Sequence, residues 1–161
     1  MAVQSEVDRD EAMRETAKHI RRVQQLLGGV SANLWSRATV HDESKFSEEE
    51  WPYFAVATSR LRGITYGSPE YKASLDSIRP GIEHHQKNNG HHPEYHENGV
   101  LDMSLLDLIE MLADWKAAGE RHADGSLERS LLVNAERFNM PPTIVKMLRT
   151  TAIELGWLHT T

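Results

Sequence analysis

The sequence has no cysteine among its 161 residues. This absence excludes disulfides, thiolate zinc sites, cysteine nucleophiles and iron–sulfur clusters of the usual kind. Uninterrupted apolar runs are short, whereas a transmembrane helix needs roughly 20 apolar residues in a row. The first ten residues are polar and contain no apolar segment that would direct secretion. We therefore expect a soluble, cytoplasmic protein.

The chain also lacks an excess of positive charge, since 18 lysines and arginines face 24 acidic residues for a net charge of −6. Sequence-independent binding of duplex nucleic acid requires a basic surface, so this activity is not expected. A membrane partner is not expected either, whereas a small anionic substrate stays compatible with a few local cations or a metal ion. The unusual feature of the composition is histidine, because five of the nine histidines lie between His84 and His96.

The hydrophobic pattern predicts an all-α protein, because no stretch alternates apolar and polar residues as a strand would. The length suits one domain, and no linker or repeat divides it. We expect a single helical bundle over residues 1–161, with about six to seven helices and a flexible tail at residues 1–6. The expected helices cover residues 7–27, 31–41, 47–61, 68–86, 103–119, 126–138 and 142–155.

Local signals set several of these boundaries. Gly28 and Gly29 are expected to end the first helix. Ser47 followed by Glu50 has the form of a capping box at a helix start. The Pro80–Gly81 pair should interrupt the fourth helix, and the segment that follows it is expected to be a histidine-rich loop.

The helix expected over residues 103–119 is apolar almost all round, which is typical of a central, covered helix. Asp107, Glu110 and Asp114 nevertheless follow one stripe of it. Buried carboxylates are costly unless they are paired or bind a cation. Asp107 and Glu110 can alternatively face solvent along an exposed edge. Asp114 is expected to point inward, with an ion pair to an arginine as its alternative.

Histidine and carboxylate side chains together suit borderline divalent metals, namely Mn, Fe, Co, Ni and Zn. The sequence places His19 on its first helix, the His41–Asp42 pair at the end of the second, the histidine cluster after that, and then Asp114. Each member alone is a weak signal, since a single histidine is commonly a packed residue and a surface cluster can be incidental. The order of all of them within one helical chain favours a metal site.

This order resembles the HD-domain metal-dependent phosphohydrolases. Residues 41–46, 84–95 and 103–116 are more closely similar to a group of small proteins found in bacteriophages and bacteria, and that resemblance covers nearly the whole chain. The superfamily resemblance implies an HD-like bundle with one or two divalent ions. It implies that one ion binds the set His19, His41, Asp42 and Asp114, and that a second adds His85 (or His84) and His92 (or His91).

The resemblance implies hydrolysis of a phosphate ester or anhydride in a small phosphorylated substrate such as a nucleotide, through a metal-activated water. Asp42 is the residue expected to bridge two ions. Lys45 is expected to contact a phosphate oxygen, and Lys87 and Tyr95 are further candidate substrate contacts, although an exposed side chain is the simpler interpretation for each. Glu94 is a candidate base or a residue that orients a ligand histidine.

Two other functions are compatible with the same residues. One is a mixed-valent di-iron oxygenase, which requires both extra histidines to bind iron. The other is a non-catalytic, metal-stabilised binding protein that sequesters a nucleotide signal or a host protein. This alternative arises because many hydrolytic members place a glutamate shortly after the His-Asp pair, where this chain has Lys45.

Overall fold

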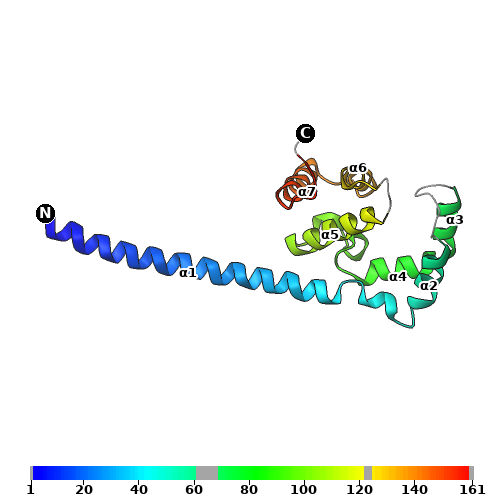
Figure 1. The fold of residues 1–161 in the computed structure, drawn as a ribbon, viewed down its shortest axis with the longest axis horizontal. Helices are drawn as coiled ribbons and strands as arrows, with labels where there is room; N and C mark the ends of the chain where they lie inside the picture. Colours follow the sequence, from blue (N-terminus) through cyan, green and yellow to red (C-terminus); the bar gives the residue numbers. More distant parts are fainter. Residues whose placement is uncertain (1, 61–68, 122–124, 160–161) are drawn as a thin grey trace. The chain divides into compact units, whose positions relative to one another are not determined.

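The computed structural model describes residues 2–60, 69–121 and 125–159 (Figure 1). All regular secondary structure in these ranges is helical, with seven α-helices and three short 3-10 helices, so the all-α prediction is confirmed. Contacts divide the chain into two compact units, residues 1–41 and 42–161. No helix in the described ranges combines the length and the hydropathy needed to span a membrane.

The first unit consists of one helix, α1 (Ala2–Val40), of 39 residues. The expected stop at Gly28 and Gly29 is wrong, because the helix runs through both glycines. A glycine costs a helix about 1 kcal/mol relative to alanine, which weakens the helix without ending it. A glycine stop instead needs a left-handed residue, and the described glycines with positive φ are Gly99 and Gly156. The tail expected at residues 1–6 overlaps α1, which begins at Ala2, and its flexibility stays a prediction.

The second unit begins with a group of short helices: η1 (Glu43–Phe46), α2 (Trp51–Arg60), α3 (Pro69–Ser77) and α4 (Arg79–Asn88). The interruption expected at Pro80–Gly81 lies two residues earlier, at Ile78 between α3 and α4, and Pro80 and Gly81 are in the first turn of α4. Gly81 is also a contact point between α2 and α4, because a Cβ atom there would lie 2.5 Å from the Cβ of Tyr53. The absence of a side chain at Gly81 thus lets the two helices approach closely.

The rest of the second unit contains η2 (Pro93–Tyr95), η3 (Gly99–Leu101), α5 (Leu105–Glu120), α6 (Leu127–Arg137) and α7 (Pro142–Glu154). Side-chain caps start two of these helices. Ser104 and Asp107 form a complete capping box at α5, and the Ser126 hydroxyl accepts from the backbone of Arg129 at α6. Gly156, with φ of 70°, lies just beyond α7. The three helices lie close to their expected positions.

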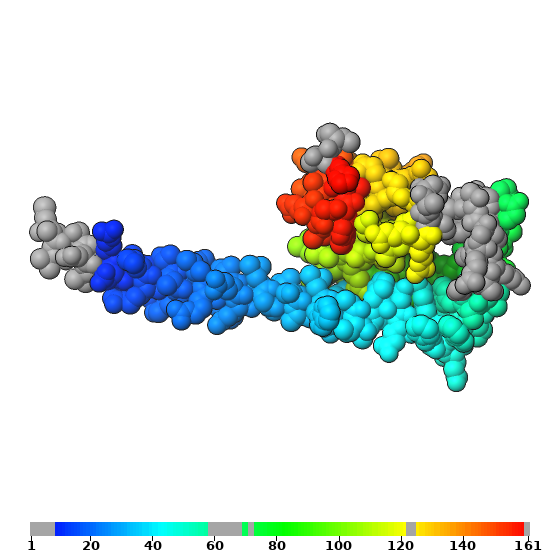
Figure 2. All heavy atoms as spheres, in the orientation of Figure 1, coloured from blue at the N-terminus to red at the C-terminus, as the bar shows by residue number. Residues whose placement is uncertain are grey.

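The hydrophobic core of the second unit lies where α5 contacts both α6 and α7. Met111 and Leu112 of α5 are at its centre, with 1% and 0% of their surfaces exposed. The space-filling view shows α5, α6 and α7, coloured yellow-green to red, closely packed (Figure 2). The buried core residues are Val100, Met103, Leu108, Met111, Leu112, Leu127, Leu131, Met140, Leu148 and Ala152. The expectation of a central, covered helix over residues 103–119 is therefore confirmed.

Candidate metal centre

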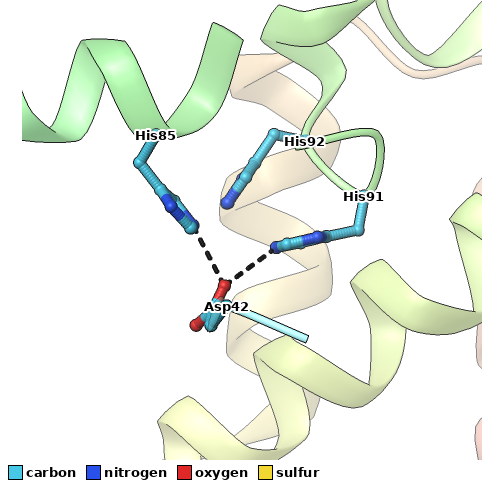
Figure 3. A group of neighbouring side chains, drawn as sticks. All are labelled: Asp42, His85, His91 and His92. Atoms are coloured by element: carbon cyan, nitrogen blue, oxygen red, sulfur yellow. Dashed lines mark ion pairs between the residues drawn. The ribbon is translucent and has the colours of Figure 1, made fainter. Parts of the chain in front are cut away.

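Four side chains of the second unit converge on one point: Asp42, His85, His91 and His92 (Figure 3). One nitrogen or carboxylate oxygen from each lies within 4.8 Å of all the others. Asp42 directly precedes η1, His85 is on α4, and the two adjacent histidines lie in the turn before η2. Residues more than 40 positions apart in the sequence thus contribute to one group.

Asp42 directs its two carboxylate oxygens to different partners. Its backbone is left-handed, with φ of 60°, a conformation that aspartate tolerates better than most residues. Oδ1 faces the histidines, at 3.0 Å from Nε2 of His85 and 3.4 Å from Nε2 of His91. Oδ2 accepts a hydrogen bond from Nζ of Lys45 at 2.5 Å. Oδ1 therefore faces the histidines, while Oδ2 is held by the ammonium group of Lys45.

His85 is buried, with 3% of its surface exposed. Its Nδ1 lies 2.8 Å from Oε2 of Glu50, on the side away from the group. Its Nε2 is directed at Asp42 Oδ1, and this buried nitrogen makes no hydrogen bond to any described residue. A buried polar atom without a hydrogen bond is unusual in a folded protein and calls for a ligand or an ion.

His91 and His92 complete the group from the turn between α4 and η2. His91 is also buried, and its Nδ1 lies 3.4 Å from Oε1 of Glu110 on α5. The His92 ring lies against both other imidazoles, with centroids 4.2 Å from His91 and 5.0 Å from His85. Nε2 of His96 is 2.9 Å from the carbonyl oxygen of Gly90, which ties the two ends of this turn together.

The protonation states of Asp42 and His92 suit cation binding. Burial of Asp42 opposes its ionisation, but the facing side chains of His85 and His91 and the ammonium of Lys45 outweigh burial and hold its pKa well below the usual range. Burial of His92, and then repulsion from His91 and His85, lower its pKa to about 3 against the opposing effect of Asp114 and Asp42. At neutral pH Asp42 is therefore ionised and His92 neutral, the forms that ligate metals.

The spacing of these atoms fits a shared ion. Two donor atoms at about 2.1 Å from one metal, separated by about 90° to 109°, lie about 3.0 to 3.4 Å apart. The two distances from Asp42 Oδ1 to the histidine nitrogens are 3.0 and 3.4 Å. Three imidazoles and one carboxylate form a donor set for borderline divalent metals. The second unit therefore contains a buried group that can hold a metal ion.

The structure also shows how the sequence alternatives are placed. Asp42, His85 and His92 are brought together, and His91 joins them, so both members of the second histidine pair are present. His84 faces away, with Nδ1 2.9 Å from Oε1 of Glu50. That these residues bind a metal stays a prediction.

Asp114 lies on α5, half-buried, with a carboxylate oxygen within 4.8 Å of one from Asp42. The same helix carries Asp107, which is 8% exposed and serves in the capping box, so its solvent-facing alternative is wrong. His41 is the last residue of the first unit and precedes Asp42 directly in the chain. Its role as a ligand stays a prediction.

His19 is placed differently from the expectation. It is exposed on α1, 21 residues before the end of that helix at Val40. At 1.5 Å per residue this corresponds to about 32 Å along the helix axis. His19 and His41 therefore cannot ligate the same ion, and the prediction that His19 helps to close the site is wrong in this structure.

Lys45 and Lys87 are the two lysines expected to contact the substrate. Lys45 contacts it through Asp42 and lies over the ring of Phe54, with Nζ 5.1 Å from the ring centroid. Lys87 is exposed on α4.

Glu94 and Tyr95 of η2 are not members of the group. Oε1 of Glu94 accepts a hydrogen bond from Arg137 of α6 at 2.8 Å, so this carboxylate is engaged in an ion pair. Tyr95 is 53% exposed and its ring lies against His96. The roles of Glu94 as a base or orienting residue and of Tyr95 as a substrate contact stay predictions.

Glu50 is the site residue that sequence reasoning missed. It is fully buried, and its carboxylate also accepts from the Ser44 hydroxyl at 3.0 Å. Burial raises its pKa, but hydrogen bonds to His84 and His85 outweigh burial and lower it. The expected capping box is half present, because the Glu50 amide donates to the Ser47 hydroxyl while the Glu50 side chain turns to the histidines.

A family model matches most of the chain. The model of the family DUF5662, described as a family of unknown function, matches residues 8–154. No curated protein and no solved structure matches the chain.

Proposed function

The chain belongs to the DUF5662 family, and from its histidine–aspartate group we propose that it is a metal-dependent phosphohydrolase. The substrate class we propose is a phosphate ester or anhydride of a nucleotide. One observation carries the proposal: buried nitrogens of His85 and His91 face a single ionised oxygen of Asp42 at the separations expected around one ion. The HD-like order of the His-Asp pair, the later histidines and Asp114 supports the hydrolytic class.

The proposed ligands are Asp42 Oδ1, Nε2 of His85, Nε2 of His91 and one nitrogen of His92. Mn, Fe, Co, Ni and Zn are the candidate ions for this set. A divalent ion bound there supplies a Lewis acid that lowers the pKa of a coordinated water to near 7. A second ion is compatible with the site, since Asp42 and Asp114 bring two carboxylates within 4.8 Å of each other.

Lys45 is the residue we propose to bind the substrate phosphate. Its ammonium has three N–H donors, and one of them goes to Oδ2 of Asp42. A remaining donor can contact a non-bridging phosphate oxygen beside the metal ligands. This ion pair adds to the effect of His85 and His91 in keeping Asp42 ionised, while Oδ1 faces the histidines. Lys45 thus orients a ligand and supplies positive charge where phosphate charge develops.

A metal-stabilised binding protein is the second candidate. Two observations favour it: Glu94, the expected base, is held by Arg137, and a lysine occupies the position where many hydrolytic HD proteins have a glutamate. Under the hydrolase proposal the bound metal must make water nucleophilic without Glu94, so Glu94→Gln should leave phosphate release within a few-fold of wild type. The di-iron oxygenase would use the same ligands, and iron content separates it from the others.

Metal content and phosphate release test the proposal together. The full chain is purified without a histidine tag after growth with manganese or iron, and its metal is measured by elemental analysis. Phosphate release is then measured on a nucleotide panel with added Mn²⁺ for wild type, Asp42→Asn and His85→Ala. His159→Ala, an exposed histidine outside the group, is the matched control.

We expect one or two ions per chain and phosphate release that the Asp42 and His85 variants lose and the control keeps. Bound metal without phosphate release from any nucleotide would contradict the hydrolase and support the binding protein. Absence of metal in wild type would contradict both.

A further inference from the structure

We propose that Glu50 is the positioning residue of the metal site, which fixes the protonated nitrogen of His85 so that Nε2 is the atom that binds the ion. This inference rests on the proposed metal site and adds a residue outside its ligand set. Oε2 of Glu50 lies 2.8 Å from Nδ1 of His85, and Nε2 of the same ring lies 3.0 Å from Oδ1 of Asp42. Glu50 is therefore behind the imidazole and Asp42 in front of it.

The hydrogen-bond directions around Glu50 follow from what each group can donate. An ionised carboxylate only accepts, so the proton of the short Glu50–His85 contact resides on Nδ1 of His85. In the neutral imidazole the other nitrogen then carries a lone pair. That nitrogen is Nε2, which is buried and directed at Asp42. Two acceptors that face each other at 3.0 Å repel unless a cation lies between them.

Two other groups lie near Nδ1 of His85, and their own bonds leave the proton with His85. Ser44 Oγ is 3.0 Å from Nδ1, but its single hydroxyl proton is directed to Glu50. Asn89 Nδ2 is 3.1 Å from Nδ1, but it has two better acceptors, Ser44 Oγ at 3.0 Å and the His85 carbonyl oxygen at 2.8 Å. With Nδ1 of His85 as a donor to Glu50, the side chains of Glu50, Ser44 and Asn89 all have hydrogen-bond partners.

Glu50 also holds the adjacent residue of α4. Its Oε1 lies 2.9 Å from Nδ1 of His84, whose side chain is 44% exposed. Adjacent residues on a helix diverge by about 100°, so a single carboxylate placed between the two rings fixes the rotation of α4 as well as the His85 ring. Because Glu50 directly precedes α2 and bonds Ser44 of η1, it connects three elements of the site.

Packing alone does not explain a carboxylate at this position. Burying an ion costs free energy, and an apolar residue of similar size commonly serves stability equally well. A carboxylate behind a ligand histidine has a different effect, because it fixes the ring tautomer and raises the basicity of the ligating nitrogen. Loss of such a partner typically costs about 10- to 100-fold in metal affinity.

The test compares Glu50→Gln with Glu49→Gln in the full chain. Glu49 is the neighbouring exposed residue, so the control removes the same charge without touching His85. Zn²⁺ affinity is measured by competition with a chromophoric chelator. We expect Glu50→Gln to bind Zn²⁺ about 10- to 100-fold more weakly than wild type. Glu49→Gln should stay within about twofold, and the metal-free proteins should melt at similar temperatures.

A second measurement reports the tautomer in the wild-type chain and does not depend on the folding of any variant. Nitrogen-15 NMR of zinc-loaded protein with labelled histidine should show a proton on Nδ1 of His85 and zinc on Nε2. Zinc on Nδ1, or an unprotonated Nδ1, would overturn the inference.

Equal Zn²⁺ affinity of Glu50→Gln and wild type would also overturn it while leaving the metal site intact. A wild-type chain that binds no Zn²⁺, Mn²⁺ or Fe²⁺ would instead remove the proposed function and this inference with it.

Discussion

Acidification of the metal-free protein should expose the cost of the buried neutral His92. Its pKa is lowered from 6.5 to about 3, first by burial and then by repulsion from His91 and His85. Between these two values the unfolded chain binds a proton at this residue and the native protein does not. Stability therefore falls as the pH falls through this window, by about 1.4 kcal/mol per pH unit. From pH 7 to pH 5 the expected loss is about 2 kcal/mol.

Urea unfolding of chelator-treated protein at pH 7 and pH 5 measures this loss. Trp115 and Trp157 pack against the core of the second unit, so their fluorescence reports its unfolding. His92→Gln is the comparison variant, because it keeps every other titrating group. The stability that Asp42 gains from its lowered pKa is fully present above pH 3.8, its ordinary pKa, and is lost only below that pH. It therefore does not change between pH 5 and pH 7.

Wild type should therefore lose about 2 kcal/mol more than His92→Gln between the two pH values. Equal losses, within about 0.5 kcal/mol, would refute the reasoning that His92 is held neutral inside the group.

Three further predictions concern the metal and the helices. A chelator should lower the melting temperature of metal-loaded wild type but not of His85→Ala. The reason is that an ion present at 100 times its Kd stabilises the native protein by about 2.7 kcal/mol. An equal melting temperature before and after verified metal removal would contradict a buried metal. Gly28→Ala should raise helicity in circular dichroism and stabilise α1 by about 1 kcal/mol, because a Cβ there meets nothing within 4 Å; lower helicity would indicate that the helix stops at this glycine. Gly81→Ala should lower the free energy of unfolding by about 1–3 kcal/mol, because its Cβ would overlap Tyr53. Unchanged stability in urea would contradict this and show that α2 and α4 can move apart at no cost.

The sequence predicted the helices of the second unit well where local signals agree. The helix over residues 103–119 has a continuous apolar pattern, and the next two have a serine cap and a proline start, so α5, α6 and α7 lie close to their expected positions. The glycine pair in α1 was misjudged because two local costs of about 1 kcal/mol do not decide whether a helix of 39 residues continues.

The sequence predicted the types of residue in the candidate site, but it did not decide which individual histidines take part. The resemblance to HD-domain proteins implied Asp42, His85 (or His84) and His92 (or His91) as ligands. Adjacent histidines cannot be told apart without the backbone path, and the structure brings His85, His91 and His92 together with Asp42. His19 was misplaced because the order of residues in a family does not report whether a helix bends between them.

Glu50 was missed because a capping glutamate and an inward carboxylate have the same sequence pattern. Only the approach of α2 to α4 places its side chain behind the histidines. Ser47, three residues earlier, already explains a glutamate at position 50 as part of a capping box. No local sequence rule indicates that His84 and His85 are the partners of the Glu50 side chain.

The most direct test of the metal centre is a crystal structure of the manganese- or iron-loaded chain with data collected at the absorption edge of that metal. We expect an anomalous peak within about 2.0–2.3 Å of Asp42 Oδ1 and of Nε2 in both His85 and His91, with His92 as the next ligand. No peak at these atoms in fully loaded protein, or a peak bound elsewhere on the chain, would contradict the account.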